Sequence, residues 1–177
     1  MSLHDKMGVR DNIALITTKG NSTTQLNLSD PRIKASGSVK FETFDSEGNL
    51  KDIQTKDNLV VTAGITHILA RMASNTPTVM THMALGSGST AAAAGNTALV
   101  SEEGRVALTT SGGTPSTSTI VYAATFPAGT ATASIVEAGV FNASSSGTML
   151  CRIVFGTVTK AAGDSMTVTW TVTLTAS

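Results

Sequence analysis

The stretch of this chain that comes closest to a chemical site is glycine-rich. Residues 84–90 read Ala-Leu-Gly-Ser-Gly-Ser-Thr, and four alanines follow. Glycines beside hydroxyl groups are typical of loops that bind phosphate through backbone N–H groups. A Walker-type loop also needs a lysine after its last glycine, and a dinucleotide loop needs a third glycine three residues after the second. No lysine follows here, and the glycine after Gly86 and Gly88 is Gly95. We therefore predict that the loop, at about 86–98, is structural and holds no cofactor.

The structural role expected for this loop is that of a linker. It would join a helix-and-strand unit to the strands that follow. Its glycines would permit positive backbone φ, and its alanines would let the backbone pack closely.

The remaining reactive side chains form no catalytic constellation. The nucleophile elbow G-x-S-x-G is absent, and serines are too common in this chain to mark a Ser-His-Asp triad. Cys151, the single cysteine, lies in a strand-like run and is expected to be a small buried hydrophobe. His67 is expected on the flank of the helix stripe or at the surface, rather than as a ligand. Glu137 is alone in an apolar strand and is expected to pair structurally with Arg152 if a hairpin brings them together. We predict no catalytic residue, no metal site and no enzymatic activity.

The clearest structural signal is an alternation at the end of the chain. Apolar residues there occupy every second position, with a threonine after each of them. A period of two predicts a strand with one face in the core and a threonine face that is exposed or against a partner. The predicted core residues are Met166, Val168, Trp170, Val172 and Leu174.

Other segments supply a helix and further strands. A helix is predicted at about 62–74, capped by Thr62, because apolar residues recur there at i, i+3, i+4 and i+7. A hairpin precedes it, with a return strand at 50–61, and another hairpin surrounds the loop at 143–148. These elements add five predicted core residues: Ile65, Ile68, Leu69, Met72 and Phe141.

The fold class follows from this order of elements. Several antiparallel strands with one helix, and no regular alternation of strand and helix, predict a mainly β protein. We expect an antiparallel β-sandwich with one short amphipathic helix and an extended N-terminal arm. The arm would comprise residues 1–37, and residues 38–177 would form a single sandwich domain.

The arm is polar and rich in turn formers, so a solvated tail is one reading of it. It nevertheless retains apolar residues that such a tail does not need. We favour an ordered arm that lies along a partner. The predicted partner contacts are Ile13, Leu15, Ile16, Leu26 and Leu28.

Composition limits the classes of partner. The chain has 12 basic and 12 acidic residues, so no net charge draws it to nucleic acid or to an anionic membrane. Charged residues make up only 14% of the sequence, which favours a surface covered by neighbours or a strand-rich particle component. The N-terminus has no apolar segment typical of a secretory signal, and no run approaches the ~18 apolar residues that cross a bilayer. We therefore expect a protein made in the cytoplasm.

Four blocks between about residue 57 and the end of the chain carry a family resemblance, and they read NLVVTAG, ALGSGSTAAAAGNTAL, EAGVFNASSSGTMLCR and MTVTWTV. The chain resembles a group of small structural proteins from the virions of tailed bacteriophages, in which similar blocks occur in the same order. The resemblance covers about residue 57 to the end, with serines where the family has threonines in the loop. The arm and the first hairpin lie outside it.

This resemblance implies a non-enzymatic virion structural protein. The first expectation is a capsid decoration (cement) protein on the outer surface of the head. It would bind the major capsid protein and copies of itself as a homo-oligomer, without contacting nucleic acid or membrane. It would be made in the host bacterial cytoplasm. A tail-fibre or baseplate component is the alternative. A host-surface carbohydrate-binding module is a second alternative, weakened by the presence of only one Trp and one Tyr.

Overall fold

The computed structural model describes residues 16–18, 23–25, 33–74 and 76–176. Residues 35–174 form one compact unit, and residues 1–34 with 175–177 form another. The smaller unit contains a hairpin of β1 (Ile16–Thr18) and β2 (Thr23–Gln25), which pair antiparallel. Of the predicted partner contacts in the arm, four lie outside the described residues: Ile13, Leu15, Leu26 and Leu28.

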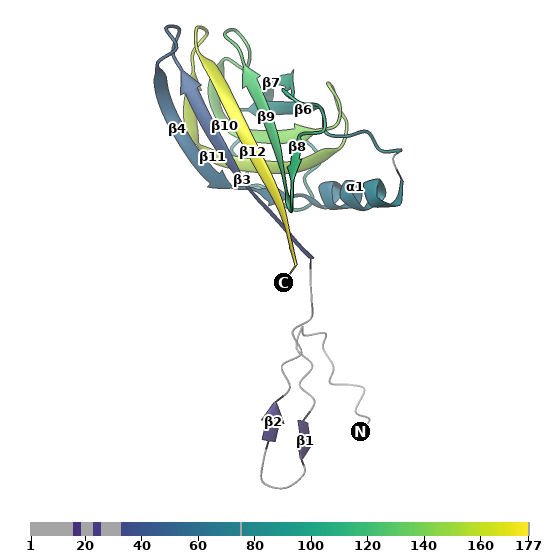
Figure 1. The fold of residues 1–177 in the computed structure, drawn as a ribbon. Coiled ribbons are helices and arrows are strands. Elements are labelled where there is room, and N and C mark those ends of the chain that lie inside the picture. The colour runs from purple at the N-terminus through teal and green to yellow at the C-terminus, as the bar shows by residue number, and fades with distance from the viewer. Residues whose placement is uncertain (1–15, 19–22, 26–32, 75, 177) are drawn as a thin grey trace. The chain divides into compact units, whose positions relative to one another are not determined.

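The larger unit confirms the predicted fold class, a mainly β antiparallel sandwich with one short helix (Figure 1). Each sheet has five strands. The first has the order β4 (Leu50–Asp57), β3 (Ile33–Phe44), β12 (Ser165–Ala176), β9 (Thr119–Phe126) and β8 (Thr114–Ser116). The second has the order β5 (Leu59–Val60), β11 (Met149–Lys160), β10 (Ala133–Phe141), β6 (His82–Gly86) and β7 (Glu102–Ala107).

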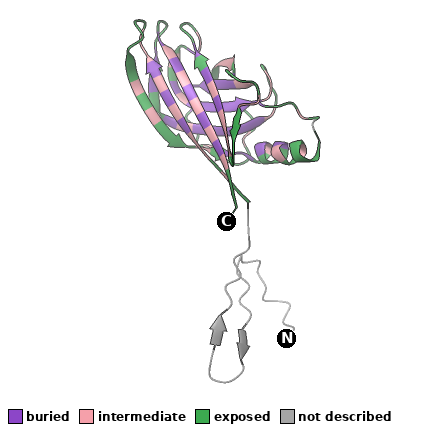
Figure 2. Cartoon of the chain, viewed as in Figure 1, coloured by how far each residue is buried: buried purple, intermediate pink, exposed green. Residues whose placement is uncertain are grey.

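The alternation in β12 places its apolar residues between the sheets, and Figure 2 shows buried and half-buried residues alternating along the strand. Met166, Val168, Trp170 and Val172 are buried. Leu174, which was expected in the core, is instead 39% exposed. Residues 174–176 are all exposed, so this end of β12 extends past the cover of the second sheet.

Phe141 is buried in a smaller apolar cluster than the one that contains Trp170. Its neighbours there come from β6, β11, the residue before the helix and the loop between β6 and β7: Ala84, Met149, Val61 and Leu99. The second sheet therefore has a second apolar layer, to which the glycine-rich loop contributes.

Trp170 should dominate the stability of the core. Trp170→Ala is expected to lower the free energy of unfolding by about 3–5 kcal/mol, since it leaves a large cavity. The indole N–H has no hydrogen-bond partner among the described residues, so Trp170→Phe removes an unsatisfied donor and should cost clearly less. Urea denaturation of the two variants tests this. Equal losses, or unshifted fluorescence emission from the folded protein, would contradict the burial of this side chain.

The helix α1 (Thr62–Ala73) exposes most of the stripe that was expected to enter the core. Ile65, Leu69 and Met72 are 46%, 59% and 75% exposed, and only Ile68 packs partly against the core. The prediction for the three exposed residues was wrong because the helix approaches the sheet through another face.

The face that packs contains Gly64 and His67, the two buried residues of α1. A Cβ added at Gly64 would lie 2.8 Å from the carbonyl carbon of Leu150 in β11. The absent side chain therefore lets the helix backbone lie directly on the strand. This orientation of the helix buries His67, which was expected on the flank of the stripe or at the surface, and it turns the apolar stripe outward.

The buried His67 should make stability depend on pH. Burial lowers the pKa of His67 below its ordinary value of 6.5, and the nearby charge of Arg71 lowers it further. The unfolded chain therefore takes up this proton more readily than the folded one, so the contribution of His67 to stability is fully present above pH 6.5 and is lost as the pH falls below it. His67→Phe should flatten the slope of the urea midpoint between about pH 5.5 and 7.5. An unchanged slope would contradict this role.

The sandwich begins earlier than residue 38, the expected boundary. β3 starts at Ile33, and Ala35 packs against the core. The carbonyl of Gly37 accepts a hydrogen bond from the N–H of Asn58 at 3.0 Å. The single return strand expected at 50–61 is also wrong, because the chain passes from β4 in one sheet to β5 in the other at Asn58.

Candidate functional site

The glycine-rich loop connects β6 to β7, which are hydrogen-bonded neighbours in the same sheet. The expectation of a linker between two units was therefore wrong. The expected backbone conformation was wrong as well, because Gly86, Gly88 and Gly95 do not have positive φ. The reason for these residue types lies in what the loop surrounds.

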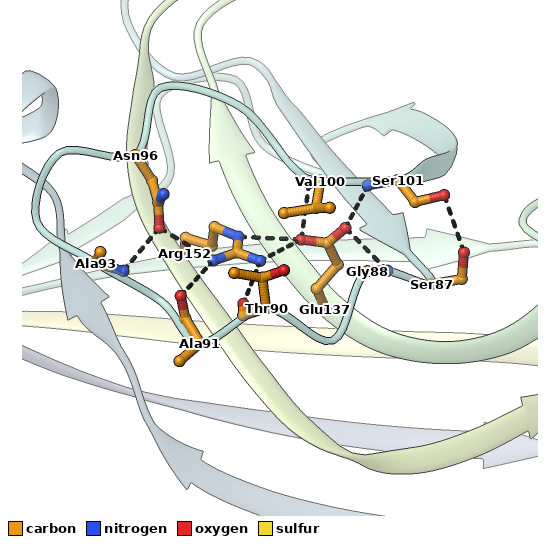
Figure 3. A network of polar contacts seen from close by, with 10 residues as sticks. All are labelled: Ser87, Gly88, Thr90, Ala91, Ala93, Asn96, Val100, Ser101, Glu137 and Arg152. Carbon is orange, nitrogen blue, oxygen red and sulfur yellow. Dashed lines mark hydrogen bonds and ion pairs between the residues drawn. The ribbon is translucent and has the colours of Figure 1, made fainter.

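The loop surrounds a buried carboxylate. Glu137 on β10 is fully buried, and three backbone N–H groups of the loop donate to it (Figure 3). Gly88 and Ser101 donate to Oε1 at 3.1 and 2.8 Å, and Val100 donates to Oε2 at 3.1 Å. The loop does bind an anion through its backbone, as phosphate loops do, and that anion is the protein's own glutamate.

Arg152 on β11 completes the site, which confirms the expected pair. Its Nε and Nη2 donate to Oε2 of Glu137 at 3.0 and 2.7 Å, and neither side chain is exposed. The remaining donors of the guanidinium reach the loop: Nη2 bonds the carbonyl of Thr90, and Nη1 bonds the carbonyl of Ala91 and Oδ1 of Asn96. All five N–H groups of the arginine are thus satisfied.

Gly86 and Gly88 are required by close approach to this pair. A Cβ at Gly88 would lie 2.5 Å from Oε1 of Glu137 and 2.5 Å from Cβ of Val100. A Cβ at Gly86 would lie 2.7 Å from the same carboxylate oxygen. Glycine therefore allows the loop backbone to lie against the carboxylate, which no other residue type permits without displacement.

The far end of the loop is tied to the helix. Oδ1 of Asn96 accepts the N–H of Ala93 at 2.7 Å as well as the arginine. The N–H of Thr62, at the start of α1, donates to the carbonyl of Ala94 at 2.8 Å. Thr62 was expected to cap the helix with its side chain, but α1 has no side-chain cap. A loop carbonyl instead satisfies one of the free N–H groups at the helix start.

A second arginine holds the neighbouring hairpin and was missed in the sequence. Arg105 on β7 pairs with both carboxylate oxygens of Glu102, at 2.9 and 2.7 Å. It also donates to the carbonyls of Ala143 and Ser146 in the loop between β10 and β11. Its guanidinium lies 3.8 Å from the ring centre of Phe141. No motif marks this role, because the carbonyls that it binds in the loop lie about 40 residues away along the chain.

A buried lysine was also missed in the sequence. Nζ of Lys160 donates to the carbonyls of Pro127 and Asp164 at 2.9 and 2.7 Å. The carboxylate of Asp164 pairs with Lys51 at 2.5 Å and accepts the N–H of Ala161. These contacts, the Lys51 hydrogen bond foremost, lower the pKa of Asp164. Like Arg105, this cluster joins strand ends.

The polar atoms of Glu137 and Arg152 are bonded to other groups of the protein. The donors of Arg152 and both oxygens of Glu137 already have protein partners, and neither side chain is exposed. Burial raises the pKa of the Cys151 thiol well above its usual range, which disfavours the nucleophilic thiolate. The arrangement fastens a loop, two strands and a helix together.

Comparison of the chain with protein-family models, curated proteins and solved structures found no match. Within the part of the chain that the structure describes, no three His, Cys, Asp or Glu side chains gather as metal ligands would. No helix in that part is long and apolar enough to cross a membrane.

Removing the buried carboxylate should severely destabilise the domain. Glu137→Ala leaves the guanidinium and three backbone N–H groups without their acceptor, so the free energy of unfolding should fall by about 3–5 kcal/mol. Glu42→Ala, which removes the partner of Lys40 in a partly exposed pair, is the control and should cost less than about 1 kcal/mol. Denaturant unfolding measures both losses. Similar small losses would refute the idea that the Glu137–Arg152 pair and its loop partners form a clamp, that is, a buried network that holds the loop, the two strands and the helix together.

The same geometry predicts that the loop does not bind nucleotide. Its N–H groups already donate to Glu137, so ATP or GTP at millimolar concentration should leave the melting temperature unchanged. A ligand that bound the native state would raise it with increasing concentration. A saturable rise would show that the loop can exchange its internal anion for phosphate.

Proposed function

We propose that this chain is a non-enzymatic structural protein of a tailed-bacteriophage virion. The proposal rests on the positions, in the folded structure, of the sequence blocks that carry the family resemblance. Three of them meet at the Glu137–Arg152 pair: the glycine-rich loop, the hairpin of β10 and β11, and the segment of β5 and α1 tied to the loop at Ala94. Hydrogen bonds between polar groups connect these three blocks to one another. The resemblance therefore concerns a scaffold, which suits a protein whose task is to be a rigid building block.

Within the particle, we propose a decoration protein on the outer surface of the head. A sandwich of this kind supplies a rigid body, and the N-terminal segment supplies a second point of attachment to a neighbouring subunit. Many weak sites on a symmetric shell, each with two attachments, raise the overall avidity through effective concentration. Contacts that exist only in the assembled shell stabilise it against internal pressure by mass action.

The two aromatic residues suited to stacking on sugars argue against a carbohydrate-binding module. Trp170 is fully buried and Tyr122 is 6% exposed. Burial raises the pKa of Tyr122 to about 12, as expected for a hydroxyl largely removed from water. Neither ring offers the exposed face that sugars require.

The experiment compares full-length protein with a chain that begins at Ile33, the first residue of β3. A cut before Ser38 would remove sheet residues and confuse folding with binding. Both proteins are added to undecorated heads, and occupancy and rupture temperature are measured. We expect the shortened chain to fold, since its melting temperature depends on the sandwich, and to bind heads much more weakly. Full-length protein should raise the rupture temperature.

Two outcomes would change this proposal. Equal occupancy with and without the N-terminal segment would remove its role in attachment. Separating heads from tails of virions, and finding the chain only in the tail fraction, would place it in the tail fibre or baseplate instead.

A further inference from the structure

An apolar groove opens beside α1 and is not part of the Glu137–Arg152 clamp. It encloses about 750 Å³ between the helix and the ends of strands β8, β9 and β12. In Figure 1, α1 lies at the end of the sandwich where β12 finishes. Apolar side chains make up much of the lining, among them Ile68, Met72, Val79, Ile120 and Leu174.

The groove continues into an exposed apolar ridge. Met72 and Leu174, which line it, are 75% and 39% exposed, and Leu69 on the same helix is 59% exposed. Gly64 holds α1 so close to β11 that the helix cannot rotate these side chains inward. Contiguous exposed apolar surface on a soluble domain typically marks an interaction site. The domain's own geometry leaves this one uncovered.

We propose that the groove binds the N-terminal segment of a second copy of this chain, through Leu26 and Leu28. The two leucines are separated by one residue, so an extended segment presents both on one face, about 6.7 Å apart. The segment around them is otherwise polar and cannot bury these side chains in a core of its own. The groove offers the apolar surface that this pair lacks.

The connection between segment and sandwich favours exchange between copies. The segment joins the sandwich unit at Ala35 in β3, and β3 is the neighbour of β12, whose Leu174 lines the groove. The sandwich unit therefore begins at the end of the domain where the groove opens. The five residues from Leu28 to Ile33 span up to about 17 Å when extended. Two copies that meet at this end can each insert the leucine pair into the other's groove, a reciprocal contact that closes as a symmetric dimer.

The test measures the molar mass of full-length purified protein over a range of concentrations. Wild type should associate. Met72→Glu places a carboxylate in the groove, and Leu26→Asp with Leu28→Asp places carboxylates on the segment, so each should lower the association constant at least about tenfold. Ile53→Glu is the matched control, since Ile53 on β4 is 52% exposed and does not line the groove. It should associate like wild type. At concentrations low enough for every protein to be monomeric, all variants should have the wild-type melting temperature, which shows that each still folds.

A mixing experiment separates segment exchange from general stickiness. The segment variant retains an intact groove, and the groove variant retains an intact segment. Mixed together, with one of them tagged, the two should form a hetero-complex that neither forms alone. A monomeric wild type would overturn the proposal, as would a segment variant that associates normally.

Self-association of this kind belongs to the proposed function, but it is measured without heads. Failure to bind heads combined with the expected mixing result would therefore count against the virion role alone.

Discussion

The buried pair of Glu137 and Arg152 constrains everything around it. Two charges removed from water are tolerated only when their hydrogen-bonding groups are filled, because the desolvation penalty otherwise exceeds their attraction. Here the loop between β6 and β7 supplies three N–H groups and two carbonyls, and Asn96 supplies a side-chain oxygen. The conformation of the loop, its lack of side chains at Gly86 and Gly88, and its bond to the start of α1 all follow from that requirement.

Charged side chains also bond loop carbonyls at other strand ends. Arg105 ties the β10–β11 hairpin to β7, and Lys160 with Asp164 ties the β11–β12 turn to the chain at Pro127. In a chain with few charged residues, several of them are used to hold loops in place. That usage favours a rigid body.

The apolar surface is concentrated where α1 meets the end of the sandwich. A glycine contact with β11 holds the helix in an orientation that covers His67 and leaves Leu69 and Met72 in solvent. The contact stabilises the packing inside the domain, but the exposure of the two apolar side chains to water is unfavourable. A partner that covers the helix would remove the conflict, which connects the packing of a single glycine to the proposed assembly.

The sequence alone determined the sandwich, the buried face of β12 with Trp170, and the pairing of Glu137 with Arg152, because period-two patterns and hairpin spacing are local properties. Only the tertiary structure decided which face of α1 is buried. An apolar stripe predicts the buried face only when no other face lets the helix lie closer to the sheet, and the face with Gly64 does so. The tertiary structure also decided the role of the glycine-rich loop. Its three N–H groups lie around a carboxylate from a strand some 40 residues away, and no local pattern encodes a contact between residues so far apart.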